Sequence, residues 1–138
     1  MRDSVSPPEF LIDRSLGRHV LARALADVGF QAHTLADVYG DREESIADVE
    51  WLERSGREGW VVLTKDARIR YRSTELAAIR SSGAKVFVVV AKKLTGPQIA
   101  DQVLANLNRI VQATRKKGPF IYAVYEKRIA LMWPKDSV

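Results

Sequence analysis

The chain has 138 residues, of which 46% are hydrophobic and 28% are charged, and it contains no cysteine. These values are typical of a single globular domain, and no apolar run approaches the ~20 residues that a membrane span requires. They exclude disulfide-stabilised scaffolds and thiolate metal centres, and we expect a cytoplasmic protein that does not associate with a membrane.

Charge is unevenly distributed along the chain. Residues 1–64 hold 7 Lys and Arg against 12 Asp and Glu, whereas residues 65–138 hold 15 against 5. An acidic site beside a basic surface suits a protein that processes a polyanion at a metal ion. The alternative is that the basic part of the chain only favours solubility.

Hydrophobic periodicity in the first part of the chain predicts alternating strands and helices. Ser15 is a candidate N-cap for the first helix, and Gly29 is a good stop for it. The expected elements are strands at 10–13 and 30–35, helices at 15–28 and 45–57, and a polar loop at 36–44.

The remainder of the chain continues the alternation and then ends in two strands. Thr95 and Gln98 have the spacing of a capping box at the start of a long helix. The expected elements are strands at 60–64, 85–91, 120–125 and 128–133, helices at 73–82 and 95–115, and a turn or short helical piece at 66–72.

This order predicts an α/β fold with three layers, in which helices cover both faces of a mostly parallel central sheet. We expect a C-terminal β-hairpin at 119–133, which adds antiparallel strands at one edge of the sheet or packs over a face. Residues 10–138 are predicted to form a single domain. Residues 1–9, which include two prolines, are predicted to form a flexible N-terminal arm.

Three carboxylates lie where such a sheet would bring them together. Asp13 ends the first strand and Asp66 follows the 60–64 strand, so both fall at carboxyl ends, where open α/β sheets place their ligands. Asp48 lies in the first turns of the 45–57 helix. Converging carboxylates raise one another's pKa values unless a divalent cation neutralises them, and Mg²⁺ or Mn²⁺ prefers such oxygen ligands.

Each of these acids also has a purely structural explanation. Asp48 stands three residues after Ser45, which is the spacing of a capping pair at a helix start. Asp13 could cap the first helix, and Asp66 could cap the turn that follows it. These alternatives remain open for each acid taken alone, and the joint pattern favours a site.

The segment from Asp48 to Asp66 resembles the C-terminal signature of PIN-domain ribonucleases. In that signature an acid on a helix is followed by the acid of a hydrophobic–Thr–basic–Asp strand end, and here the two acids are 18 positions apart. Thr64 matches the hydroxyl residue, and Phe10–Asp13 is similar to the family's opening strand and first acid. The compact size resembles the VapC toxins of type II toxin–antitoxin pairs, and more closely a short PIN-like branch without the middle helices.

The resemblance implies a metal-dependent endoribonuclease, a hydrolase that binds Mg²⁺ or Mn²⁺ at Asp13, Asp48 and Asp66. Thr64 would support these acids by hydrogen bonding. The implied substrate is RNA of the tRNA or rRNA class, and the implied products carry a 5′-phosphate and a 3′-hydroxyl. The implied partners are a cognate antitoxin protein and a second copy of the chain in a homodimer.

One feature of full-length PIN domains is missing, namely a glutamate on a middle helix. Only 34 residues lie between Asp13 and Asp48, which is too few for those helices. Glu44, one turn before Asp48, is the candidate for this fourth metal ligand, with Glu43 and Asp41 as alternatives. A reduced metal site, or a weak nuclease, is the other interpretation.

Cations gather next to the predicted acids, and Tyr71 lies among them. Neutralisation of phosphates together with base stacking is a common way to hold single-stranded RNA. Arg14 could instead pair with a site acid, and the segment 65–72 could simply be a solvated charged turn. The predicted RNA-binding residues are Arg14, Arg18, Lys65, Arg68, Arg70 and Arg72.

Two other functions were weighed against this one. A phosphoryl-receiver domain would need paired acids at the end of the first strand, where the sequence has only Asp13. A PIN-like RNA-binding or partner-binding domain would keep the fold with weak or no catalysis. Binding of Mg²⁺ or Mn²⁺ that disappears in Asp66→Asn would distinguish the ribonuclease from this alternative.

Overall fold

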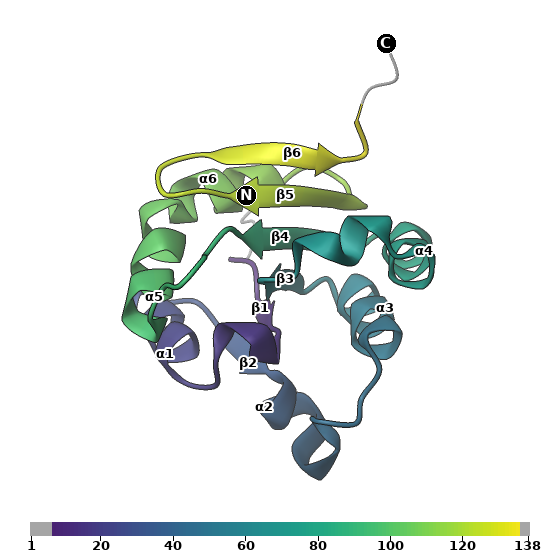
Figure 1. Ribbon diagram of the computed structural model, residues 1–138, viewed down its shortest axis with the longest axis horizontal. Coiled ribbons are helices and arrows are strands. Elements are labelled where there is room, and N and C mark those ends of the chain that lie inside the picture. The colour runs from purple at the N-terminus through teal and green to yellow at the C-terminus, as the bar shows by residue number, and fades with distance from the viewer. Residues whose placement is uncertain (1–6, 136–138) are drawn as a thin grey trace, which may run out of the picture.

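Six strands form one sheet in the computed structural model, which describes residues 7–135. In sheet order they are β2 (Ala32–Thr34), β1 (Phe10–Ile12), β3 (Val61–Thr64), β4 (Lys85–Val89), β5 (Phe120–Val124) and β6 (Ile129–Trp133). The strands β1 to β5 pair in parallel, and only β6 is antiparallel to its neighbour. Figure 1 shows β6 and β2 at the two edges of the sheet.

The helices cover both faces of this sheet, which confirms the predicted three-layer α/β fold. Figure 1 shows α1, α5 and α6 on one side and α3 and α4 on the other. The helices are α1 (Val20–Asp27), α2 (Leu35–Tyr39), α3 (Asp48–Glu58), α4 (Ser73–Ser82), α5 (Gly96–Ala105) and α6 (Leu107–Thr114). Three short 3₁₀ segments are η1 (Arg14–Leu16), η2 (Gly40–Arg42) and η3 (Ala67–Tyr71).

The apolar strands explain the two cores of the molecule. Successive residues of a strand point to opposite faces, so Phe10 and Ile12 join the core under α1, α5 and α6, whereas Leu11 joins the core under α3 and α4. Because both faces are covered, the central strands are apolar at nearly every position instead of alternating.

Two expectations for the first part of the chain were wrong. The helix expected from Ser15 begins at Val20, because Gly17 has φ +89° and Ser15 donates its hydroxyl hydrogen to Asp13 instead of capping a helix. The segment 36–44, expected as a loop, contains α2 and η2. The Thr34 side chain and the Asp37 side chain form a capping box that starts α2.

The long helix expected at 95–115 is two helices that meet at Asn106. This side chain is fully buried, and its Nδ2 donates to the carbonyl oxygens of Gln102, Tyr125 and Glu126 at 2.9, 2.7 and 3.2 Å. The hairpin loop therefore docks on the helix at this residue. The expected β-hairpin is present as β5 and β6, although β5 itself continues the parallel sheet beside β4.

Of the predicted N-terminal arm, residues 1–6 lie outside the described residues. Its last residue, Glu9, accepts a hydrogen bond from the Val61 amide at 2.7 Å through its main chain and lies 2.8 Å from His33 Nε2 through its side chain. No helix within residues 7–135 is long and apolar enough to cross a membrane.

Candidate active site

The carboxyl ends of β1 and β3 bring Asp13 and Asp66 to the same edge of the sheet. The two strands are parallel with Ile12 opposite Leu63, so Asp13 follows at the level of Thr64 and Asp66 comes two residues beyond it. Thr64 joins them, because its hydroxyl donates to Asp13 Oδ2 at 2.8 Å and accepts from the Asp66 amide at 3.1 Å. Thr64 and Asp13 are buried. Thr64 thus links the residues at the two strand ends through its hydroxyl group.

Asp13 is held by two hydroxyl groups. Besides Thr64, Ser15 donates its hydroxyl hydrogen to Asp13 Oδ2 at 2.7 Å, and the Ser15 oxygen accepts from the Lys65 amide at 3.1 Å. Asp13 precedes η1 but makes no side-chain cap hydrogen bond there. The helix-capping alternative for this acid is therefore not realised, and both hydroxyl contacts orient its carboxylate.

Asp48 is the first residue of α3. Its Oδ1 accepts a hydrogen bond from Trp51 Nε1 at 3.1 Å. Burial raises the pKa of Asp48, and the negative charges of Asp13 and Glu75 raise it further against the Trp51 hydrogen bond. Ser45 donates to the Arg42 carbonyl instead of pairing with Asp48, so the capping pair suggested by the sequence does not form.

Asp66 is neutralised by arginine. Its Oδ1 accepts from the Arg68 amide at 3.0 Å, which realises the capping of the turn, and its Oδ2 accepts from Arg72 Nη1 at 2.5 Å. Burial alone would raise the pKa of Asp66, but the hydrogen bonds from Arg72 and Arg68 outweigh it, and the pKa is lowered. Asp66 is therefore already paired with a cation, the guanidinium of Arg72.

Glu75, in the first turn of α4, is an acid of this region that the sequence analysis missed. Its side chain is 13% exposed, and its Oε1 is buried without a hydrogen-bond partner in the described part of the chain. The nearest cation is Arg72, whose Nη1 lies 3.7 Å from that oxygen. The spacing of Arg72 and Glu75, three residues apart at a helix start, was the available signal.

Arg72 connects these acids. The hydrogen bond and the charge of Asp66 raise the pKa of Arg72, and the charges of Glu75 and Asp48 add to this effect. We call Asp13, Asp48, Asp66 and Glu75 the acidic cluster. Arg72 is the cation that lies among its members.

Glu44, the predicted fourth ligand, lies on the surface. Its neighbour Glu43 is 8% exposed and forms an ion pair with Arg18. Arg14 Nη1 donates to the Glu43 carbonyl oxygen at 2.5 Å. Arg14 and Arg18 thus hold the segment before α3 in place, and a fourth ligand at Glu44, or at its alternatives Glu43 and Asp41, stays a prediction.

The other predicted RNA-binding cations lie on η3 or just before it. Lys65 is exposed, and Arg68 has a 78% exposed side chain with its Nε 3.6 Å from Asp66. Arg70 lies over the ring of Tyr71, with its guanidinium carbon 4.6 Å from the ring centre, and Tyr71 is 73% exposed. Lys65 and Arg68 are thus the cations that the structure leaves most open beside the acids.

The acidic cluster supplies oxygen donors, which are the ligands that Mg²⁺ and Mn²⁺ prefer. Glu75 Oε1 is buried without a hydrogen-bond partner in the described part of the chain, and burial together with the charges of Asp13 and Glu75 raises the pKa of Asp48. Within residues 7–135, however, no three Asp, Glu or His side chains stand close enough together to hold an ion. The carboxylate oxygens of the acidic cluster are suitable ligands for a divalent ion. In the observed arrangement, Arg72 neutralises the charge of Asp66.

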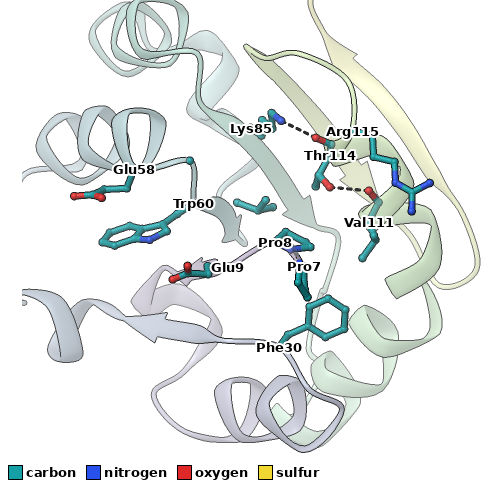
Figure 2. Close-up of a pocket in the computed structure, with 12 residues that line it drawn as sticks. Pro7, Pro8, Glu9, Phe30, Glu58, Trp60, Lys85, Val111, Thr114 and Arg115 are labelled. Carbon is teal, nitrogen blue, oxygen red and sulfur yellow. Dashed lines mark hydrogen bonds between the residues drawn. The ribbon is translucent and has the colours of Figure 1, made fainter. Parts of the chain in front are cut away.

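A hollow of about 470 Å³ lies at the opposite edge of the sheet, where β3 and β4 begin. Figure 2 shows Trp60, Phe30 and Glu9 around it, with Lys85 turned to the Thr114 carbonyl oxygen, to which it donates at 2.6 Å. Its lysine is therefore already satisfied, and none of the predicted site residues lines it.

Comparison with known proteins places the chain in a family. Residues 8–91, which contain the whole acidic cluster, match the family model described as PIN like domain. A Mycobacterium tuberculosis protein named "Putative ribonuclease VapC45" is 34% identical over 119 residues, which cover 86% of this chain and 86% of the relative. No solved structure matches the chain.

Proposed function

Because the chain belongs to the PIN-like domain family, we propose that it is a metal-dependent endoribonuclease. The observation that carries the proposal is the bridge through Thr64, which joins Asp13 and Asp66 at the carboxyl ends of adjacent parallel strands. Burial and the negative charges of Asp13 and Glu75 raise the pKa of Asp48, which supports its inclusion in the same site. The ribonuclease name of the Mycobacterium tuberculosis relative supports the same activity.

The residues that would hold Mg²⁺ or Mn²⁺ are the four acids of the acidic cluster. A bound ion of this kind lowers the pKa of a water molecule and stabilises the leaving oxygen of a phosphodiester. Thr64 and Ser15 keep Asp13 oriented, and Trp51 orients Asp48. Arg72 competes with any ion for Asp66 Oδ2, so this arginine has to move for Asp66 to become a ligand.

The resemblance to VapC toxins extends the proposal to a biological role. We infer that the protein is the toxin of a type II toxin–antitoxin pair, with a cognate antitoxin as partner and RNA of the tRNA or rRNA class as substrate. Growth arrest on expression, relieved by Asp13→Asn, would support the toxin role. Unimpaired growth with the active enzyme would contradict it.

Cleavage of total RNA by the purified full chain tests the activity. We expect 5′-phosphate products with Mg²⁺ or Mn²⁺ and none with EDTA. Asp13→Asn should lower the rate about a hundredfold or more, because metal-ion catalysis supplies several kcal/mol. Asp27→Asn removes an exposed acid of α1 and serves as the matched control.

Cleavage that persists in EDTA, or an Asp13→Asn protein as active as Asp27→Asn, would contradict the proposal. The second candidate function is a PIN-like RNA-binding or partner-binding domain with weak or no catalysis, which the neutralisation of Asp66 by Arg72 favours. It predicts RNA binding by the wild-type chain without cleavage in either metal.

A further inference from the structure

A second aromatic and basic surface lies between η3 and the end of β6. A hollow of about 270 Å³ there is lined by Arg70, Tyr71, Met132, Trp133 and Lys135. These residues come from separate regions of the sequence and meet because η3 reaches the side of the sheet on which Met132 and Trp133 pack. We call this hollow the η3–β6 groove.

Each aromatic ring of the groove is paired with a guanidinium. Arg70 lies 4.6 Å from the Tyr71 ring centre, and Arg80 lies 5.5 Å from the Trp133 ring centre. A ring that holds a cation on one face keeps its other face for a further stacking partner. Tyr71 is 73% exposed, although burial in a core is the usual way to stabilise so large an apolar side chain.

Charge separates the groove from two other hollows of the described chain, whereas a hollow beside α6, lined by Arg109, Arg115 and Lys116, is also basic. The hollow at the start of β3 and β4 contains Glu9 and Glu58, and another beside α5 contains Asp101 and Glu126. The η3–β6 groove is lined by positive side chains. Within the described residues, 7–135, no acidic residue lines it. Its ligand is therefore expected to be an anion.

The groove is continuous with the acidic cluster along the chain. Tyr71 directly precedes Arg72, which donates to Asp66, and consecutive Cα atoms are about 3.8 Å apart. A polynucleotide whose reacting phosphate lies at the acids would thus have its neighbouring nucleotides next to Tyr71. Aromatic rings between cations are the arrangement that binds single strands, because every base can stack and every phosphate is negative.

We propose that the η3–β6 groove binds a single-stranded segment of the RNA substrate, with a base stacked on Tyr71 and phosphates near Arg70, Arg80 and Lys135. This inference rests on the proposed ribonuclease function. It extends the predicted RNA-binding surface from the cations of residues 65–72 to the residues at the end of β6. Stacking of this kind tolerates any base, so the groove contributes affinity and strand selection without reading sequence.

Fluorescence anisotropy with a labelled 12-nucleotide single-stranded RNA, in EDTA to prevent cleavage, tests the groove on the full chain. Tyr71→Ala should weaken binding about tenfold, since stacking on one aromatic ring is worth about 1–3 kcal/mol per base. Because Tyr71 is exposed, the truncation should leave folding intact. Tyr71→Phe keeps the ring and should bind within about twofold of wild type.

Lys127→Gln is the charge control, because Lys127 lines the hollow beside α5. Arg80→Gln, which removes the cation over the Trp133 ring of the groove, should weaken binding more than Lys127→Gln does. Wild-type affinity in Tyr71→Ala, or a larger loss in Lys127→Gln than in Arg80→Gln, would overturn the proposal. A change in sedimentation of Tyr71→Ala without a change in RNA affinity would also overturn it, because this face would then be a protein contact.

A parallel cleavage assay with Mn²⁺ separates this inference from the proposed function. If the wild-type chain cleaves RNA while Tyr71→Ala binds RNA normally, the groove proposal is wrong and the ribonuclease proposal is supported. If Tyr71→Ala loses RNA binding while the wild-type chain cleaves no RNA, the groove proposal is supported and the catalytic proposal is wrong.

Discussion

Arg72 is the residue that decides how the acidic cluster behaves without a metal. It donates to Asp66 Oδ2 at 2.5 Å, and its Nη1 lies 3.7 Å from Glu75 Oε1. A guanidinium that neutralises two acids in the metal-free protein also competes with a divalent cation for them. Arg72 is one of the RNA-binding cations predicted from the sequence, whereas in the structure its guanidinium lies against Asp66 and Glu75.

We therefore expect Arg72→Gln to bind Mn²⁺ more tightly than the wild-type chain. We expect a gain of only a few-fold in affinity, because exposed ion pairs contribute little. Isothermal titration calorimetry measures the change. Arg68→Gln, at a more exposed arginine with a longer contact to Asp66, should have a smaller effect. Weaker Mn²⁺ binding in Arg72→Gln would show that the arginine does not compete with the ion.

Asp48 predicts a pH-dependent stability of the metal-free protein. Its folded pKa is raised above the ordinary value of 3.8, so ionisation of Asp48 costs more in the folded than in the unfolded state. Asp48→Asn removes this cost and keeps the acceptor for Trp51. It should be more stable than wild type in urea at pH 7, and the difference should shrink as the pH falls through the folded pKa towards 3.8.

Asp66→Asn should change the stability of the folded protein in the opposite direction to Asp48→Asn. Its folded pKa is lowered, so the ionised side chain contributes stability above the ordinary pKa that is lost as the pH falls through the folded value. Asp66→Asn should thus be less stable than wild type at pH 7. If both variants shift stability in the same direction at pH 7, the electrostatic description of the cluster is wrong.

Individual site residues differed in how well the sequence predicted them. Asp13, Thr64 and Asp66 were predictable, because parallel strands bring their carboxyl ends to one edge whatever the details of packing. Glu75 was not, because its inward direction depends on how α4 packs against α3. Glu44 lies near Asp48 in sequence, yet Glu43 and not Glu44 is the buried residue of that pair.

The packing of α3 against α4 positions half of the cluster, since α3 begins with Asp48 and α4 carries Glu75. Gly56 is where the two helices come closest. A Cβ atom built on Gly56 would lie 2.2 Å from Ser82 Oγ and 2.6 Å from the Ser82 carbonyl oxygen. Because one of these atoms belongs to the backbone, a side-chain rotation cannot relieve the contact.

Gly56→Ala should therefore destabilise the protein even though alanine favours a helix by about 1 kcal/mol over glycine. Overpacking at such a site costs about 1–3 kcal/mol and should also move Asp48 away from Glu75. Urea denaturation measures the first effect and Mn²⁺ affinity the second. Gly96→Ala is the control, because its nearest neighbour, Val20, lies at an ordinary 3.4 Å. Equal stability of the two variants would contradict this view of the helix pair.

At the level of elements, the apolar strands and the glycine stops were predictable from local sequence. The helix 73–82 was predicted with its observed bounds, because Gly83 takes φ +74° and ends it. The break at Asn106 was not, since the hydrophobic stripe runs through it without interruption. Only the carbonyl groups of the distant hairpin loop explain why a polar residue is buried there.

The whole molecule divides its charge as the sequence indicated. The acidic cluster draws Asp13 and Asp48 from the acidic part of the chain, residues 1–64. The basic part supplies Asp66, Glu75 and Arg72 together with the cations of the η3–β6 groove. Because screening of phosphate contacts by salt weakens RNA binding, affinity should fall steeply with ionic strength. Arg72 brings the basic part of the chain into contact with the acids at the carboxyl ends of β1 and β3.

The central claim is that Asp13, Asp48, Asp66 and Glu75 form a single site for a divalent ion. Calorimetric titration of the metal-free full chain with Mn²⁺ tests it most directly, with Glu75→Gln beside Glu44→Gln as a pair of matched isosteric changes. We predict that the wild-type chain binds Mn²⁺, that Glu75→Gln weakens binding about tenfold or more, and that Glu44→Gln leaves it within about twofold. No binding by the wild-type chain, or a loss in Glu44→Gln with none in Glu75→Gln, would contradict the account.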